Sequence, residues 1–292
     1  MNQRTIGDVD VSAIGLGGMP MSIEGRPDER RSIATIHAAL EAGVTLIDTA
    51  DAYHLAAHDE VGHNESLIAK AIAEFGGDTS HVIVATKGGH LRPEAGAWAQ
   101  NGHPEYLKEA AKASAKRLGV EAIDLYQFHR PDPEVPYADS VGALKDLLDE
   151  GVIRMAGISN ATVDQIRDAN GILDDRLVSV QNQFSPAFRS SEIELALCDE
   201  LGIAFLPWSP LGGISGAADL GTSFEAFATV ARNHGVSPQV VALAWELGKS
   251  DVVIPIPGAS RPQSILDSVT APTIKLHPEE TEALDAASPA DA

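Results

Sequence analysis

Four side chains that can hold or transfer a proton stand at or near the ends of short apolar runs in the first half of the chain: Asp48, Tyr53, Lys87 and His129. The runs are rich in β-branched residues, which is typical of parallel strands buried on both faces. If the ends of these strands converge, a carboxylate, a phenol, an amine and an imidazole form a proton-transfer set.

The chemistry of this set follows from its residue types. A tyrosine is a poor acid at neutral pH, since its unperturbed pKa is about 10. We expect the Lys87 ammonium to favour the Tyr53 phenolate and lower that pKa, with Asp48 holding Lys87 in place and His129 donating a hydrogen bond to a carbonyl oxygen. Taken singly, each residue has a structural explanation as a loop cap, rim packing, a solvated lysine or a buried histidine. Only their joint placement favours catalysis.

Composition limits the possible partners. The 292 residues include 42 acidic and 21 basic side chains, a formal net charge of -21. This balance argues against nucleic-acid binding and against anionic membrane surfaces, so any anionic ligand must find its positive contacts locally. The single cysteine, Cys198, excludes a disulfide within the chain. With no signal peptide and no run near the roughly 18 apolar residues of a membrane span, we expect a cytoplasmic protein.

Strands and helices are predicted to alternate along the whole chain. The expected strands are 13–16, 44–47, 82–86, 123–128, 153–158, 178–181, 203–207 and 252–256. The expected helices are 30–42, 65–75, 105–118, 138–149, 163–170, 192–201, 224–234 and 262–268. We therefore predict an α/β fold, a (β/α)8 TIM barrel forming one domain over residues 1–292. A short N-terminal β-hairpin (1–12) and two extra helices (238–248 and 279–287) complete it, and the four candidate residues would share one mouth.

Several motifs together resemble the aldo-keto reductase superfamily over about residues 4–268. They lie at 48–53, 85–87, 125–132, 157–160, 181–183, 207–212 and 256–261. The resemblance implies that Tyr53 is the general acid/base, that Lys87 and Asp48 tune it, and that His129 positions the carbonyl group.

The same resemblance implies a nicotinamide coenzyme. Ser159, Asn160 and Gln181 match positions that hydrogen-bond the carboxamide, and Trp208 matches an aromatic side chain that stacks on the ring. The full expected set is Gly18, Met19, Ser159, Asn160, Gln181, Trp208, Ser209, Leu211, Gly213, Gly258, Ser260, Arg261, Ser264, Asp267 and Ser268. The glycines at 15–18 lack the spacing of a Rossmann fingerprint, and Pro20 follows where a helix should begin.

The adenosine end departs from the family pattern. Many members carry a basic residue and then a Glu-Asn pair, whereas this chain has Ser264 and Asp267-Ser268. Arg261 remains as a possible clamp for a 2′-phosphate. NADPH is therefore the expected coenzyme, with NADH possible.

Substrate and metal sites are less defined. Met19, Trp98 and Phe184 are expected to face a small carbonyl or alcohol substrate. The loop 54–63 holds His54, His58 and His63 beside two acids, but solvated loop histidines are the commoner case and we expect no metal.

Three functions explain these patterns to different degrees. The first is an NADPH-dependent reductase of aldehydes or ketones, or the reverse oxidation. The second is a nicotinamide-binding sensor or regulatory subunit with little turnover. The third is an aldolase or isomerase that forms a Schiff base on Lys87, and it does not explain the presence of Trp208 and Ser159-Asn160. The sequence leaves the substrate, the reaction direction and the oligomeric state open.

Overall fold

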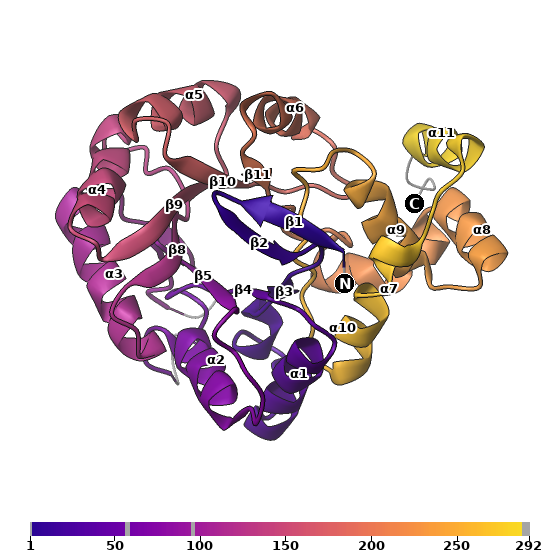
Figure 1. The fold of residues 1–292 in the computed structure, drawn as a ribbon, viewed down its shortest axis with the longest axis horizontal. Coiled ribbons are helices and arrows are strands. Elements are labelled where there is room, and N and C mark those ends of the chain that lie inside the picture. The colour runs from indigo at the N-terminus through magenta and orange to yellow at the C-terminus, as the bar shows by residue number, and fades with distance from the viewer. Residues whose placement is uncertain (1, 56–58, 95–96, 288–292) are drawn as a thin grey trace.

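A curled parallel sheet forms the centre of the molecule. The computed structural model describes residues 2–55, 59–94 and 97–287, and Figure 1 shows the sheet inside a ring of helices. Its strands are, in spatial order, β11 (Ala204–Phe205), β10 (Leu177–Gln181), β9 (Ile153–Ser159), β8 (Ile123–Phe128), β5 (Ile83–Gly88), β4 (Leu46–Asp48) and β3 (Leu16–Gly17). This α/β arrangement confirms the predicted fold class.

The segment 252–258 joins the two edges of the sheet in place of the expected eighth strand. Val253 bridges to Phe205 at one edge, and Gly258 bridges to Gly17 at the other. The segment is not a regular strand because Pro255 and Pro257 have no N–H to donate. Their carbonyl oxygens still accept hydrogen bonds from the β3 edge, since Gly15 N and Gly17 N donate to Pro255 O and Pro257 O at 2.9 Å.

The helices match the predicted alternation closely. They are α1 (Glu29–Glu41), α2 (His63–Glu74), α3 (Pro104–Leu118), α4 (Tyr137–Asp149), α5 (Val163–Ile172), α6 (Glu192–Leu201), α7 (Gly213–Ser223), α8 (Glu225–His234), α9 (Pro238–Leu247), α10 (Pro262–Ser268) and α11 (Pro278–Ala286). Gly119 and Gly202 end α3 and α6 with φ of 72° and 68°, a conformation that glycine adopts without strain. Within the described ranges no helix is long and apolar enough to cross a bilayer.

Two elements were missed from the sequence. Helix α7 occupies a stretch for which no helix was predicted, and a small hairpin, β6 (His90–Leu91) with β7 (Ala99–Gln100), interrupts the segment after β5. The glycines of α7 conceal it, because glycine has low helix propensity.

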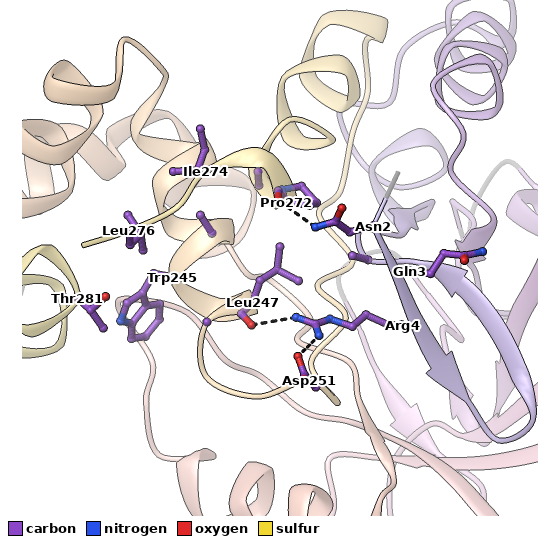
Figure 2. Close-up of a pocket in the computed structure, with 14 residues that line it drawn as sticks. Asn2, Gln3, Arg4, Trp245, Leu247, Asp251, Pro272, Ile274, Leu276 and Thr281 are labelled. Carbon is purple, nitrogen blue, oxygen red and sulfur yellow. Dashed lines mark hydrogen bonds and ion pairs between the residues drawn. The ribbon is translucent and has the colours of Figure 1, made fainter. Parts of the chain in front are cut away.

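The predicted N-terminal hairpin closes the bottom of the barrel. Strands β1 (Gln3–Ile6) and β2 (Val9–Ser12) pair antiparallel and lie across the centre of the strand ring in Figure 1. Ile6 and Val11 belong to the same buried cluster as inward-facing strand residues such as Leu125. Arg4 pairs with Asp251 and donates to Leu247 O at 3.2 Å beside a pocket at this end (Figure 2). The opposite end, where the strands finish, stays open for a site.

Glu246 is a buried carboxyl group in α9. Its side chain is fully buried, and in the described part of the chain neither carboxyl oxygen has a hydrogen-bond partner. Burial raises the pKa of this carboxyl well above its usual value. Such a group costs folding free energy, because its lost hydration is not replaced.

We expect Glu246→Met, which keeps the side-chain length, to raise the free energy of unfolding at neutral pH by about 1–3 kcal/mol. The folded protein holds the Glu246 proton to higher pH than the unfolded chain, whose pKa is about 4.3, so wild type loses stability as pH rises through this window. In urea denaturation at about pH 5 and about pH 8, Glu246→Met should therefore raise the free energy of unfolding more at the higher pH. Glu109→Met, at an exposed position on α3, serves as control. An equal stabilisation by Glu246→Met at both pH values would contradict the raised pKa of Glu246.

Candidate active site

Three neighbouring strands bring the four candidate side chains together. Asp48 is the last residue of β4, Lys87 lies near the end of β5, and His129 directly follows β8. These strands are adjacent and parallel, so their carboxyl ends share one edge of the barrel. Tyr53 lies on the loop after β4. The convergence predicted from the sequence is thus present in the structure.

Hydrogen bonds connect this group through the Lys87 ammonium. Lys87 Nζ lies 2.7 Å from Asp48 Oδ2, 2.8 Å from Thr49 O and 3.4 Å from Tyr53 Oη. These three acceptors match the three protons of an ammonium group. The other carboxylate oxygen, Asp48 Oδ1, accepts from Gln181 Nε2 at 2.8 Å. The ion pair is buried, and the ammonium group and both carboxylate oxygens have hydrogen-bond partners.

Burial and nearby charges have opposite effects on the pKa values of Lys87 and Tyr53. Burial acts to lower the pKa of Lys87, but the charge of Asp48 and the contact with Tyr53 outweigh it and raise that pKa. Burial raises the pKa of Tyr53 above 10, and the opposing effect of Lys87 is smaller. The expected net lowering of the Tyr53 pKa is therefore wrong for this state, because desolvation of the phenolate outweighs the ammonium charge. Tyr53 is a protonated phenol at neutral pH.

His129 is a neutral imidazole. Burial, then the charge of Lys87, lower its pKa well below the usual value. Its ring meets the Tyr53 ring edge-on at 5.8 Å and the His90 ring at 4.8 Å between centroids. A neutral imidazole still has one N–H to donate, which suits binding of a carbonyl oxygen.

A cleft of about 1100 Å³ extends from these residues to α10. Asp48, Tyr53 and His129 line it, whereas Lys87 is fully buried behind them. The expected coenzyme residues that line it are Met19, Ser159, Asn160, Gln181, Trp208, Ser209, Leu211, Gly213, Gly258, Ser260, Arg261, Ser264, Asp267 and Ser268. One continuous cleft therefore contains nearly the whole set.

Two expected residues lie elsewhere. Gly18 is packed behind the cleft, where its N–H donates to Asp48 O at 2.8 Å and an added Cβ would lie 2.4 Å from Asn64 Oδ1. Phe184, expected to face substrate, is fully buried and stacks on Trp245 at 5.4 Å between centroids. It follows β10 in an irregular segment, so strand alternation did not predict its direction.

The other two expected substrate residues do line the cleft. Met19 belongs to the short helix η1 (Met19–Met21), and Trp98 lies beside the β6–β7 hairpin with 42% of its surface exposed. Trp98 stacks on His90 at 4.6 Å, and the Arg92 guanidinium lies 4.9 Å from its ring centroid. These contacts hold an apolar face in the same cleft as the candidate residues Tyr53 and His129.

Polar groups at the ends of β9 and β10 form the middle of the cleft. Ser159 Oγ donates to Gln181 O at 2.7 Å, and Asn160 Nδ2 donates to His129 O at 3.0 Å. Asn160 adopts φ of 57°, in the left-handed region that a non-glycine residue seldom occupies. Trp208 Nε1 is buried and has no partner among the described residues.

At the far end of the cleft, α7 and α10 supply polar and cationic groups. Helix α7 begins after Gly212, which has φ of 83°. Arg261 Nε donates to Ser264 Oγ at 3.0 Å, and Asp267 Oδ2 accepts from Ser237 Oγ at 2.6 Å. Several further residues that the sequence patterns did not indicate also line the cleft, among them Arg31, His90, Gln100, Arg130 and Gln239. They lie on α1, on α9, on the β6–β7 hairpin and on the loop after β8, and their direction toward the cleft depends on packing between segments distant in sequence.

The histidine-rich loop does not assemble into a metal centre within the described residues. His63 Nδ1 lies 2.8 Å from Ser22 Oγ, and Asp59 Oδ1 accepts from Arg26 Nη2 at 3.0 Å. His58 lies outside the described residues.

Comparisons with known proteins agree with this geometry. The sequence profile of the Aldo/keto reductase family matches residues 13–289. An uncharacterised oxidoreductase of Schizosaccharomyces pombe is 38% identical over 285 residues, covering 96% of this chain and 88% of the relative. A probable aldo-keto reductase of Glycine max is 33% identical over 295 residues, covering 91% of this chain and 82% of the relative.

Among solved structures, the thermostable aldo-keto reductase Tm1743, in complex with the inhibitor epalrestat, superposes with a TM-score of 0.81. It is 27% identical, and the match covers 98% of this chain and 99% of that one. Sequence and fold thus agree over nearly the full length. The chain belongs to the aldo/keto reductase family and is an oxidoreductase.

Proposed function

We propose that this enzyme reduces an aldehyde or a ketone to an alcohol with NADPH, or runs the reverse oxidation. One observation carries the proposal: the buried chain Asp48–Lys87–Tyr53 ends on a phenol in the wall of a long cleft, beside a neutral His129. A phenol and an imidazole N–H at one point are what a carbonyl oxygen needs as it becomes an alcohol.

The cleft fits a dinucleotide coenzyme in size and in chemistry. Its volume of about 1100 Å³ exceeds that of most sites for drug-sized ligands. Trp208 offers an aromatic face near the catalytic group, and Asn160 and Ser159 offer amide and hydroxyl groups beside it. Gly212 and Gly213 leave the backbone at the start of α7 open to a pyrophosphate, where N–H groups and the helix dipole favour negative charge.

The proposed mechanism assigns one task to each residue. When bound, the nicotinamide supplies a hydride to the carbonyl carbon. Tyr53 Oη holds the proton that passes to the carbonyl oxygen, and His129 donates a hydrogen bond that fixes this oxygen. Lys87 stabilises the phenolate left on Tyr53, and Asp48 holds Lys87 charged and in place. Burial of the group excludes water, which strengthens each of these interactions.

The preference for NADPH rests on two arginines. Arg261 precedes α10, and Arg31 lies in the first turn of α1, which packs beside α10. Both line the same end of the cleft, and neither has an ion-pair partner among the residues that the structure describes. In a protein of net charge -21, two unpaired guanidinium groups fit a phosphate monoester on the adenosine ribose. Arg31 therefore supplies the positive charge that Ser264 lacks.

We expect Tyr53→Phe to lower kcat for carbonyl reduction by about 10²- to 10⁴-fold, because the proton donor is lost while the ring stays. The dissociation constant for NADPH, measured by quenching of tryptophan fluorescence, should change little. Tyr137→Phe removes a phenol packed against Phe128, outside the cleft, and controls for the substitution itself. Near-normal turnover of Tyr53→Phe would refute its role as the acid. Coenzyme binding by wild type, without consumption on a broad panel of aldehydes and ketones, would instead indicate a sensor.

We expect Arg31→Ala and Arg261→Ala each to raise the dissociation constant for NADPH by about 10- to 100-fold, the usual cost of losing a hydrogen bond to a charged group. Binding of NADH, which lacks the 2′-phosphate, should be nearly unaffected, so the NADPH/NADH affinity ratio falls. Arg30→Ala, one residue away on α1 and outside the cleft lining, is the matched control. Equal or tighter binding of NADH by wild type would refute the preference.

A further inference from the structure

The cleft is a positively charged region in a strongly acidic protein. Among the described residues it is lined by three arginines, Arg31, Arg130 and Arg261, and by two carboxylates, Asp48 and Asp267. Both carboxylates are already bonded, Asp48 to Lys87 and Gln181, and Asp267 to the Ser237 hydroxyl. The arginines are therefore the charges left for a ligand.

Arg130 stands apart from the other two arginines. Arg31 and Arg261 lie beside α10, at the end proposed for the adenosine phosphate. Arg130 directly follows His129, and its guanidinium carbon lies 6.0 Å from the ring centroid of Trp208. Burial, and then the charge of Arg130, lower the pKa of His90 to about 4, so His90 is neutral within the field of this cation. Arg130 thus adds a positive charge at the catalytic end, away from the coenzyme phosphates.

Arg130 also lacks the kind of partner that Arg92 has. Arg92, whose guanidinium lies 4.9 Å from the ring centroid of Trp98, pairs with Glu24 and donates to His54 O at 2.7 Å. Arg130 is half-buried, yet within the described ranges it makes no ion pair and no side-chain hydrogen bond. A partly desolvated guanidinium group without a partner is costly, so its presence beside the reacting atoms favours an anionic ligand there.

We infer that Arg130 binds a carboxylate on the substrate, so that the enzyme acts on carbonyl compounds that carry a carboxylate group. The inference rests on the proposed function and names its substrate class. A single guanidinium fork matches the two oxygens of a carboxylate, and the neutral His90 beside it adds no second cation that a phosphate dianion would require.

The carboxylate takes no part in the chemical step. Hydride adds to the carbonyl carbon, the Tyr53 proton goes to the carbonyl oxygen, and the carboxylate leaves unchanged on a hydroxy acid. Arg130 fixes one end of the substrate while Tyr53 and His129 hold the other. Two-point attachment orients the carbonyl group, which raises the rate beyond what binding alone gives.

The test compares two probes that differ in one charge, 4-formylbenzoate and its methyl ester. We expect wild type to have the higher kcat/KM on the carboxylate. Arg130→Gln should lower the ratio of kcat/KM for the carboxylate to that for the ester by about 10- to 100-fold, and Arg130→Lys should restore part of it. Arg154→Gln removes one positive charge from a side chain that is 67% exposed and outside the cleft lining, and should leave the ratio unchanged.

Binding of 4-formylbenzoate to the NADP⁺-loaded protein, measured by calorimetry, gives a readout without turnover. It should weaken in Arg130→Gln by a similar factor. An unchanged ratio with unchanged binding would overturn the inference, as would a loss of coenzyme affinity in Arg130→Gln, which would place Arg130 in the coenzyme site. Arg130-dependent carboxylate binding with no carbonyl reduction by wild type would support the anion site and refute the proposed function. Reduction of the ester by wild type without preference for the carboxylate would support the proposed function and refute the anion site.

Discussion

The buried ion pair of Lys87 and Asp48 is the interaction on which the rest of the site depends. An ammonium group with no exposed surface is tolerated only if each proton has an acceptor, and here Asp48, Thr49 and Tyr53 provide them. Asp48 in turn needs a donor for its second oxygen, which Gln181 supplies from β10. Strands β4 and β10 are not neighbours in the sheet, so this bond exists only because the sheet curls until they face each other.

Closure of the barrel therefore matters for catalysis as well as for stability. The segment 252–258 joins β11 to β3 through isolated bridges, and the hairpin of β1 and β2 fills the bottom of the barrel. The hairpin closes the end of the barrel where the strands begin, so the polar residues at the carboxyl ends of the strands lie at the opposite, open end. Three of the four side chains proposed to perform chemistry then lie at the ends of strands, while most of those proposed to contact the coenzyme phosphates and the substrate come from loops and helices.

The sequence predicted the residues at strand ends, but it did not predict the positions of residues on loops and helices. Asp48, Lys87 and His129 were predictable because each ends a strand, and parallel strand ends share an edge. Phe184 was not, because it lies beyond β10 in an irregular segment where the alternation of strand faces no longer applies. The environments of Arg31 and Arg130 depend on contacts between α1 and α10 and between loops that are distant in sequence, which local patterns do not record. Helix α7 was hidden by its glycines, and the eighth strand was overpredicted because the prolines of 252–258 prevent a regular ladder.

The opposing effects on Tyr53 act at different moments. In the resting state burial dominates and keeps the phenol protonated, so the proposed acid carries its proton before a substrate binds. The Lys87 charge interacts weakly with a neutral phenol and strongly with a phenolate, so its stabilisation grows as the proton leaves. Arg130 also stabilises the phenolate, more weakly than Lys87, since its charge acts to lower the pKa of Tyr53. A cation that anchors the substrate would then also favour the charge that develops on the acid, which joins substrate recognition to proton transfer in one electrostatic field.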